Sequence, residues 1–128
     1  MKNFTIFILS LLCISVFAQT EVKISFNKYI SNRGYHLQLK KVFNDSRCPK
    51  NVSCIWEGEV SAIIAVYCDQ KFVEEQTLTL NSKNRNENNL WFSKYYCNKI
   101  KSIEIFPYPK EGLIVKEKKK FLKIVFID

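Results

Sequence analysis

The chain has 128 residues, of which 47% are hydrophobic and 25% are charged, and it carries a formal net charge of +8. This length excludes a multidomain protein and predicts one domain with a modest core, since such a chain buries roughly two thirds of its unfolded surface. The positive charge favours anionic partners such as phospholipid, lipopolysaccharide or acidic glycan, although solubility alone is the commoner reason for such a charge.

Residues 1–18 have the pattern of a secretory signal peptide. Lys2 supplies the positive charge, and an apolar run follows from Phe4 to Phe17. Val16 and Ala18 occupy the two positions that signal peptidase reads, which predicts cleavage after Ala18. The sequence therefore predicts an exported protein.

The remaining residues, 19–128, are expected to form a single β domain that is periplasmic or secreted. The N-terminal apolar run is shorter than the roughly 20 residues that cross a bilayer, and no second run of that kind follows, so no transmembrane segment is expected. Cys13 leaves one alternative open, which is lipidation after cleavage in front of that cysteine. Leu12 precedes it, however, where Gly, Ala or Ser is usual.

Alternation of apolar and polar side chains predicts about seven strands. In chain order, the predicted strands are Glu21–Ile30, Tyr35–Lys40, Val60–Cys68, Phe72–Leu80, Leu90–Tyr96, Lys101–Phe106 and Lys120–Ile127. The third of them is apolar on both faces, which is typical of a strand that is covered on both sides. The pattern favours a central place for it in a sheet.

Turn signals separate the strands, and no convincing amphipathic helix is present. The polar segments Asn44–Ser53 and Asn81–Asn89 are expected to be loops. Pro107 and Pro109 end the strand before them, because proline cannot donate to a β-ladder. Leu113–Val115 is expected to be a short strand or bulge. The predicted fold class is all-β: an antiparallel β-sandwich or small barrel, monomeric and stapled by disulfides.

Without Cys13 the chain has four cysteines, an even number that in an exported protein predicts two disulfides. We favour Cys48–Cys54, which closes a short loop, and Cys68–Cys97, which joins two distant segments. The other two connectivities remain open at this point.

The segment between Asp45 and Gly58 is the most distinctive in the chain. Asp45 suits a turn, because its side chain accepts backbone N–H bonds, and Pro49 restricts Cys48 to extended geometry. Trp56 precedes the central strand and is expected to be buried against the sheet. Gly58 allows a bulge or a close backbone approach.

At these residues the chain resembles a family of small exported proteins of Bacteroidetes-like bacteria. The family shares an Asp-Ser-Arg-Cys-Pro segment, a Cys-x-Trp-x-Gly segment and a C-terminal Pro-Tyr-Pro, which here are Asp45–Pro49, Cys54–Gly58 and Pro107–Pro109. The family has no assigned activity, so the resemblance implies export and the first disulfide but no function. Glu57 departs from the small residue that often follows Trp in the family, and the Cys68–Cys97 pair is not part of the family pattern.

Four residues are candidates for binding a ligand: Asp45, Arg47, Glu57 and Tyr108. Arg47 leads, because its planar guanidinium suits carboxylates, phosphates and sugar acids. The alternative is an internal ion pair of Arg47 with Asp45 or Glu57. Tyr108 is either an exposed aromatic anchor or a plug over the end of the sandwich.

A group of lysines near the C-terminus offers a surface for an anionic polymer. The favoured interpretation is instead that they protect an edge strand from pairing with another sheet. These lysines are Lys116, Lys118, Lys119, Lys120 and Lys123.

No catalytic residue, metal or cofactor is expected. His36 is the only histidine, and the spacing of Cys48 and Cys54 is not that of a redox motif. Asp45, Glu57 and Glu59 could offer carboxylates to calcium, but they are not accompanied by the closely spaced acidic residues of a calcium-binding loop. Asp45 and Glu57 form a carboxylate pair of the kind that hydrolyses glycosides, but a chain of this size rarely carries the deep cleft required.

The sequence therefore predicts an exported, non-enzymatic binding domain for a protein or glycan, of which a hydrolase inhibitor is one concrete version. This expectation rests on a disulfide-closed loop on a β scaffold, which lowers the ordering cost of binding. The main alternative is a structural envelope protein that binds anionic surface polymer through its lysines, and a small hydrolase is a further one. No specific binding of nucleic acid is expected.

Overall fold

The computed structural model describes residues 21–26, 30–32, 34–50 and 52–127. The expected signal peptide and its cleavage site lie outside these residues. Seven strands, one α-helix and one short 3-10 helix make up the described chain.

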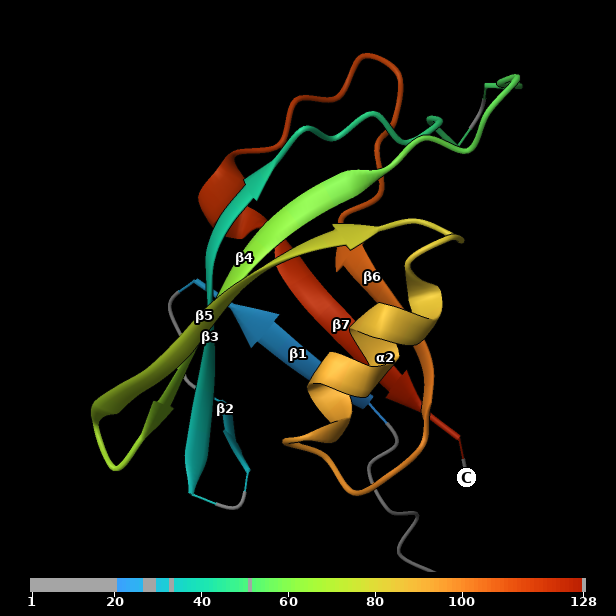
Figure 1. Ribbon diagram of the computed structural model, residues 1–128. Coiled ribbons are helices and arrows are strands. Elements are labelled where there is room, and N and C mark those ends of the chain that lie inside the picture. The colour runs from blue at the N-terminus through green and yellow to red at the C-terminus, as the bar shows by residue number, and fades with distance from the viewer. Residues whose placement is uncertain (1–20, 27–29, 33, 51, 128) are drawn as a thin grey trace, which may run out of the picture.

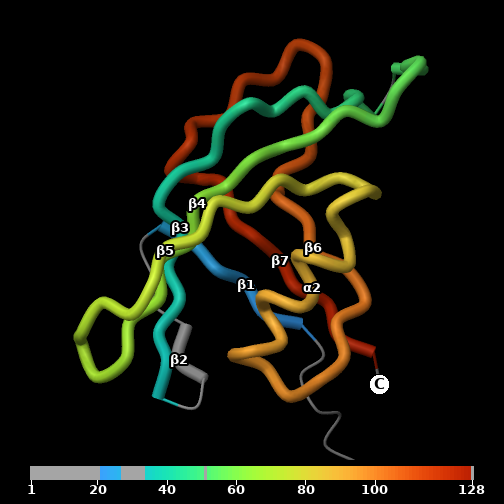
Figure 2. The backbone as a smooth tube through the Cα atoms, in the orientation of Figure 1, coloured from blue at the N-terminus to red at the C-terminus, as the bar shows by residue number. Residues whose placement is uncertain are grey.

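The strands form two antiparallel sheets whose directions cross in Figure 1, and the tube in Figure 2 follows the same path. One sheet has the order β1-β7-β6 and the other the order β2-β3-β4-β5. This arrangement confirms the predicted all-β class. The strands lie in two layers, as in the predicted sandwich. The bounds are β1 Glu21–Ser25, β2 Ile30–Asn32, β3 Tyr35–Phe43, β4 Val60–Cys68, β5 Lys71–Leu80, β6 Ile100–Phe106 and β7 Phe121–Phe126.

The central strand of the larger sheet is β4, which lies between β3 and β5 as its apolar sequence predicted. Its side chains are buried on both faces, with Ile64, Ala65 and Val66 all inaccessible to solvent. From the smaller sheet, Ile24 and Leu122 enter the same core. Burial of these aliphatic groups is the main stabilising contribution that holds the sheets together.

The segment between β5 and β6 corrects the sequence analysis. Asn81–Asn89 was expected to be a loop and Leu90–Tyr96 a strand, but residues Arg85–Ser93 form the helix α2. The helix buries Asn88, Trp91 and Phe92, which lie three and four residues apart and so share one face. The asparagine on the buried face, Asn88, obscured the apolar spacing of the helix.

Three smaller expectations are also wrong. Glu21–Ile30 was expected to be one strand, but β1 ends at Ser25 and Ile30 begins β2 in the other sheet. Leu113–Val115 forms no strand and lies in an exposed loop. The C-terminal strand β7 is not an edge strand, since it pairs with β1 on one side and with β6 on the other. The lysines on β7 therefore do not protect a free sheet edge.

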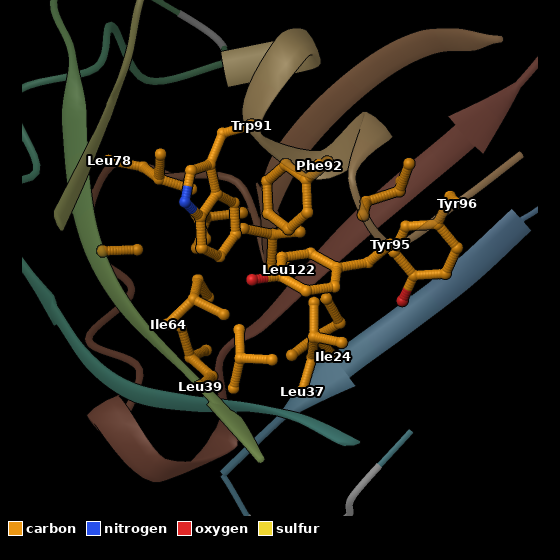
Figure 3. Close-up of a cluster of buried hydrophobic side chains, with 14 of the residues drawn as sticks. Ile24, Leu37, Leu39, Ile64, Leu78, Trp91, Phe92, Tyr95, Tyr96 and Leu122 are labelled. Carbon is orange, nitrogen blue, oxygen red and sulfur yellow. The ribbon is translucent and has the colours of Figure 1, made fainter. Parts of the chain in front are cut away.

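Aromatic rings from α2 and the residues after it fill the space between the helix and the sheets (Figure 3). The Trp91 ring contacts Phe92 at 4.9 Å and Tyr95 at 5.4 Å between centroids, and Tyr96 contacts Phe126 at 5.4 Å. The two Trp91 contacts are edge-to-face and the Tyr96 contact is tilted, and together they favour a fixed packing of the helix on the core.

The expected Cys68–Cys97 disulfide is not formed, so this prediction is wrong. Aromatic packing joins the two segments instead. Tyr35, the cross-strand partner of Cys68, contacts Tyr95, two residues before Cys97, with the ring centroids 5.0 Å apart. The aromatic rings of Tyr35 and Tyr95 thus connect the two segments that the disulfide was expected to join.

The two tyrosines after α2 are expected to respond oppositely to loss of the hydroxyl group. The Tyr95 hydroxyl donates a hydrogen bond to the Glu74 carboxylate. The Tyr96 hydroxyl is buried with no hydrogen-bond partner among the described residues, and burial raises the pKa of Tyr96 to about 12. Tyr95→Phe should lower the free energy of unfolding by about 1–2 kcal/mol, and Tyr96→Phe should raise it by about 0.5–1 kcal/mol. Urea unfolding of both variants checks this, and an equal loss in both would mean that Tyr96 has a partner.

Candidate binding site at the loop end

The first element of the site is the disulfide loop, residues 44–59, which joins β3 to β4. The predicted Cys48–Cys54 disulfide is present and closes its outer part. Backbone hydrogen bonds join its two arms, from Ser46 N–H to the Glu59 carbonyl at 2.8 Å and from Cys48 N–H to the Glu57 carbonyl at 3.3 Å. The base of the loop is thus held like a hairpin.

Gly58 allows the two arms of the disulfide loop to approach this closely, as the sequence predicted. Its φ is +72°, in the left-handed region that glycine adopts without steric cost. A Cβ atom at this position would lie 2.0 Å from the Ser46 carbonyl oxygen and 2.9 Å from the Arg47 Cα. Only glycine fits here without separating the arms.

Arg47 ties the disulfide loop to β6 and is not a free contact residue, contrary to the leading hypothesis. Its guanidinium donates to both carboxylate oxygens of Asp45, at 2.9 and 2.8 Å. It also donates to the Ile105 carbonyl and lies 4.7 Å from the centroid of the Tyr108 ring. The Arg47 side chain is only 7% exposed. The internal pair with Asp45, the alternative left open by the sequence, is the observed arrangement.

The Arg47–Asp45 pair predicts a loss of stability in acid. Partial burial raises the pKa of Asp45, but the hydrogen bonds and charge of Arg47 outweigh it and hold the pKa below its ordinary value of 3.8. The stabilisation is therefore present above pH 3.8 and is lost as the pH falls through the lower folded value.

Asp45→Asn should accordingly melt at a lower temperature than the wild type at neutral pH, and the difference should shrink below about pH 4. Thermal melts across this range measure it, with the exposed Glu75→Gln as control. A difference that stays constant with pH would contradict the role given to the Asp45 carboxylate.

A groove of about 310 Å³ lies beside the disulfide loop and brings three of the four predicted binding residues together. Arg47, Glu57 and Tyr108 line it, and Asp45 contacts it through Arg47. The opposite wall comes from the end of β5, the start of α2 and β6. The polar wall residues that were not identified from the sequence are Asn81, Ser82, Arg85, Asn88, Asn89, Ser102 and Glu104, and the apolar ones are Val60, Leu80, Ile103 and Ile105.

Glu57 is held in the groove by the residues after β5. Its carboxylate accepts hydrogen bonds from the Ser82 N–H at 2.9 Å and from the Ser82 hydroxyl at 2.7 Å. These hydrogen bonds hold the pKa of Glu57 below its ordinary value. The neighbouring Glu59 accepts a hydrogen bond from Asn81 at 2.9 Å. The groove is thus lined by both polar and apolar side chains, and the carboxylates of Glu57 and Glu59 already have hydrogen-bond donors from this domain.

Trp56 is exposed, which corrects the expectation that it packs against the sheet. Its exposed fraction is 79%, and that of the preceding Ile55 is 93%. The arms of the loop close at Gly58 and Arg47, so the residues beyond them project away from both sheets (Figure 1). The other tryptophan, Trp91, takes the core position and is only 8% exposed.

A second loop, residues 107–116, lies at the same end of the molecule and is called the C-terminal loop (Figures 1 and 2). It begins directly after β6, as Pro107 and Pro109 predicted, and the Pro109 carbonyl accepts a hydrogen bond from Lys50 N–H at 3.1 Å. Tyr108 is half-buried, with its ring against the Arg47 guanidinium, so it is not a fully exposed aromatic anchor. Leu113 and Ile114 are exposed.

The C-terminal lysines divide between two environments. Lys123 on β7 pairs with Glu21 at 3.1 Å and lies over the Phe106 ring. Lys116, Lys118 and Lys119 are exposed in and beside the 3-10 helix η1, Glu117–Lys119. These three remain accessible to an anionic partner.

No protein-family model, no curated protein and no solved structure matches this chain. In the part of the chain that the structure describes, no helix is long and apolar enough to cross a membrane. No group of three or more His, Cys, Asp or Glu side chains with metal-binding geometry occurs in that part either.

Proposed function

We propose that this chain is an exported, non-enzymatic binding domain whose contact surface is the loop end, meaning the tip of the disulfide loop together with the C-terminal loop. The observation that carries the proposal is the exposure of Ile55 and Trp56 on a loop whose base is fixed. Large apolar groups held in water at one end of a small domain are typical of an interaction surface.

The fixed base supports binding on energetic grounds. The disulfide, the Gly58 contact and the Arg47–Asp45 pair hold the disulfide loop before any partner arrives. A surface that is already ordered loses little conformational entropy on binding, so more of its contact energy becomes affinity. Tryptophan is also the residue most enriched among those that dominate binding energy.

The state of the carboxylates favours this proposal over a small hydrolase. Glycoside hydrolysis needs one carboxyl that stays protonated near neutral pH. Asp45 and Glu57 both have a lowered pKa, Asp45 through Arg47 against partial burial and Glu57 through Ser82. Neither suits the role of general acid.

A structural envelope protein that binds anionic polymer is the second candidate function. It is favoured by the exposed Lys116, Lys118 and Lys119. The variant Trp56→Ser separates the two, because it should leave binding through the lysines alone unchanged and should weaken binding at the loop end.

Site-specific photo-cross-linking tests the proposal. A photoreactive amino acid at position 56 should give discrete adducts when the chain is made in its own cell, and the same group at position 72 should not. Phe72 is the matched control, since it is an exposed aromatic residue opposite Tyr67, near the end of β4 that lies away from the disulfide loop. Equal labelling from both positions, or no adduct with protein or lipid from position 56, would contradict the proposal.

A further inference from the structure

The loop end presents apolar side chains on two separate loops. The disulfide loop contributes Val52, Ile55 and Trp56, and the C-terminal loop contributes Leu113 and Ile114, of which Ile114 is 97% exposed. Both loops lie at the same end of the sandwich (Figure 1) and are joined by the hydrogen bond from Lys50 to Pro109. Because the apolar side chains project from two loops at one end of the domain, they suit a broad, deformable partner surface better than a single pocket on a partner.

Lysines accompany the apolar residues on both loops. Lys50 lies two residues before Val52, and Lys110 and Lys116 flank the pair of Leu113 and Ile114. All three lysines are exposed. Long basic side chains beside apolar tips can reach phosphate groups while the apolar groups enter the hydrocarbon boundary.

Acidic side chains do not cancel this charge at the tips. Glu111 is the only acidic residue in the C-terminal loop. Residues 48–56 of the disulfide loop contain no acidic residue, and Glu57 and Glu59 lie at the base of the loop, where they accept hydrogen bonds from Ser82 and Asn81. Together with the net charge of +8, this distribution is complementary to an anionic surface.

We propose that the loop end docks on the surface of an anionic phospholipid bilayer, with Trp56 and Ile114 inserted at the level of the headgroups and the lysines on the lipid phosphates. This assignment rests on the proposed function and names the class of its partner. Tryptophan is suited to this depth, because its ring is apolar and its N–H is polar, and it is enriched at membrane interfaces.

Vesicle flotation tests the assignment. The wild-type chain should float with vesicles of phosphatidylcholine and phosphatidylglycerol and should not float with phosphatidylcholine alone. Trp56→Ser and Ile114→Ser should each weaken binding about 10-fold. The matched controls Phe72→Ser and Leu90→Ser remove exposed apolar side chains elsewhere and should bind like the wild type. Melting temperatures confirm that all four variants are folded.

The emission of Trp56 supplies a second readout, because the other tryptophan is already buried. Mixed vesicles should shift the emission of the wild type to shorter wavelength, and brominated lipid should quench it. Neither effect should occur in Trp56→Ser. Flotation that is unchanged in Trp56→Ser would mean attraction by charge alone and would overturn insertion.

Failure of the lipid assignment is distinguishable from failure of the proposed function. A chain that ignores both kinds of vesicle but cross-links a discrete protein through position 56 would retain the loop end as contact surface and overturn only the lipid partner. A chain that does neither would overturn both proposals.

Discussion

Gly58→Ala is expected to lower the free energy of unfolding by about 3 kcal/mol or more. The new methyl carbon would lie 2.0 Å from the Ser46 carbonyl oxygen and 2.6 Å from its carbon, and both atoms belong to backbone that cannot rotate away. The arms of the disulfide loop would have to separate. Their backbone hydrogen bonds would be lost, and Arg47 would be displaced from Asp45.

Gly112→Ala is the matched control for this substitution. Gly112 has a φ of +79°, close to that of Gly58, but a Cβ atom there meets nothing within 4 Å. It should therefore cost only the conformational penalty of a left-handed alanine, about 1–2 kcal/mol. Denaturant unfolding of both variants measures the difference. Equal losses would show that the close contact with Ser46 does not exist in solution.

The two tryptophans are expected to differ sharply in what they contribute to stability. Trp91→Ala should cost about 3–5 kcal/mol, as large core truncations do, because the Trp91 ring packs on Phe92 and Tyr95 between α2 and the sheets (Figure 3). Trp56→Ala should cost less than about 1 kcal/mol, as most surface substitutions do. Urea unfolding of the two variants provides the comparison.

The outcome for Trp56 also decides how the disulfide loop is understood. If Trp56→Ala were as destabilising as Trp91→Ala, the Trp56 ring would have to pack on its own domain. The loop end would then lose its largest exposed apolar group. An unchanged melting temperature, by contrast, leaves Trp56 available to a partner.

Most of the strands were predictable from sequence because their period-two pattern is produced directly by burial of one face, but the short strand β2 was not recognised as separate from β1. The central place of β4 followed in the same way from its two apolar faces. The place of β7 did not follow, since lysines on a strand indicate a solvent-facing side and carry no information about which strands lie beside it. Helix α2 was missed because its buried face includes Asn88, whose amide donates to the Thr79 carbonyl.

Parts of the candidate site could also be found from sequence. The turn-forming and conformationally restricted residues around Asp45 and Arg47 indicated where the disulfide loop lies. Gly58 indicated a close backbone approach, which the structure contains. The sequence could not decide whether Arg47 faces inward, because the distant Ile105 carbonyl and Tyr108 ring hold it there. Trp56 was wrongly expected to be buried, because large apolar residues usually are. No local sequence pattern shows that a loop projects beyond the sheets.

Acrylamide quenching of Trp56 fluorescence tests the central claim most directly, which is that the loop end displays this side chain to solvent. Trp91→Phe leaves Trp56 as the only tryptophan, because the chain contains two. In the free protein, the account predicts emission like that of tryptophan in water and strong quenching by acrylamide. Emission at short wavelength that acrylamide fails to quench would place Trp56 against the domain and would contradict the account.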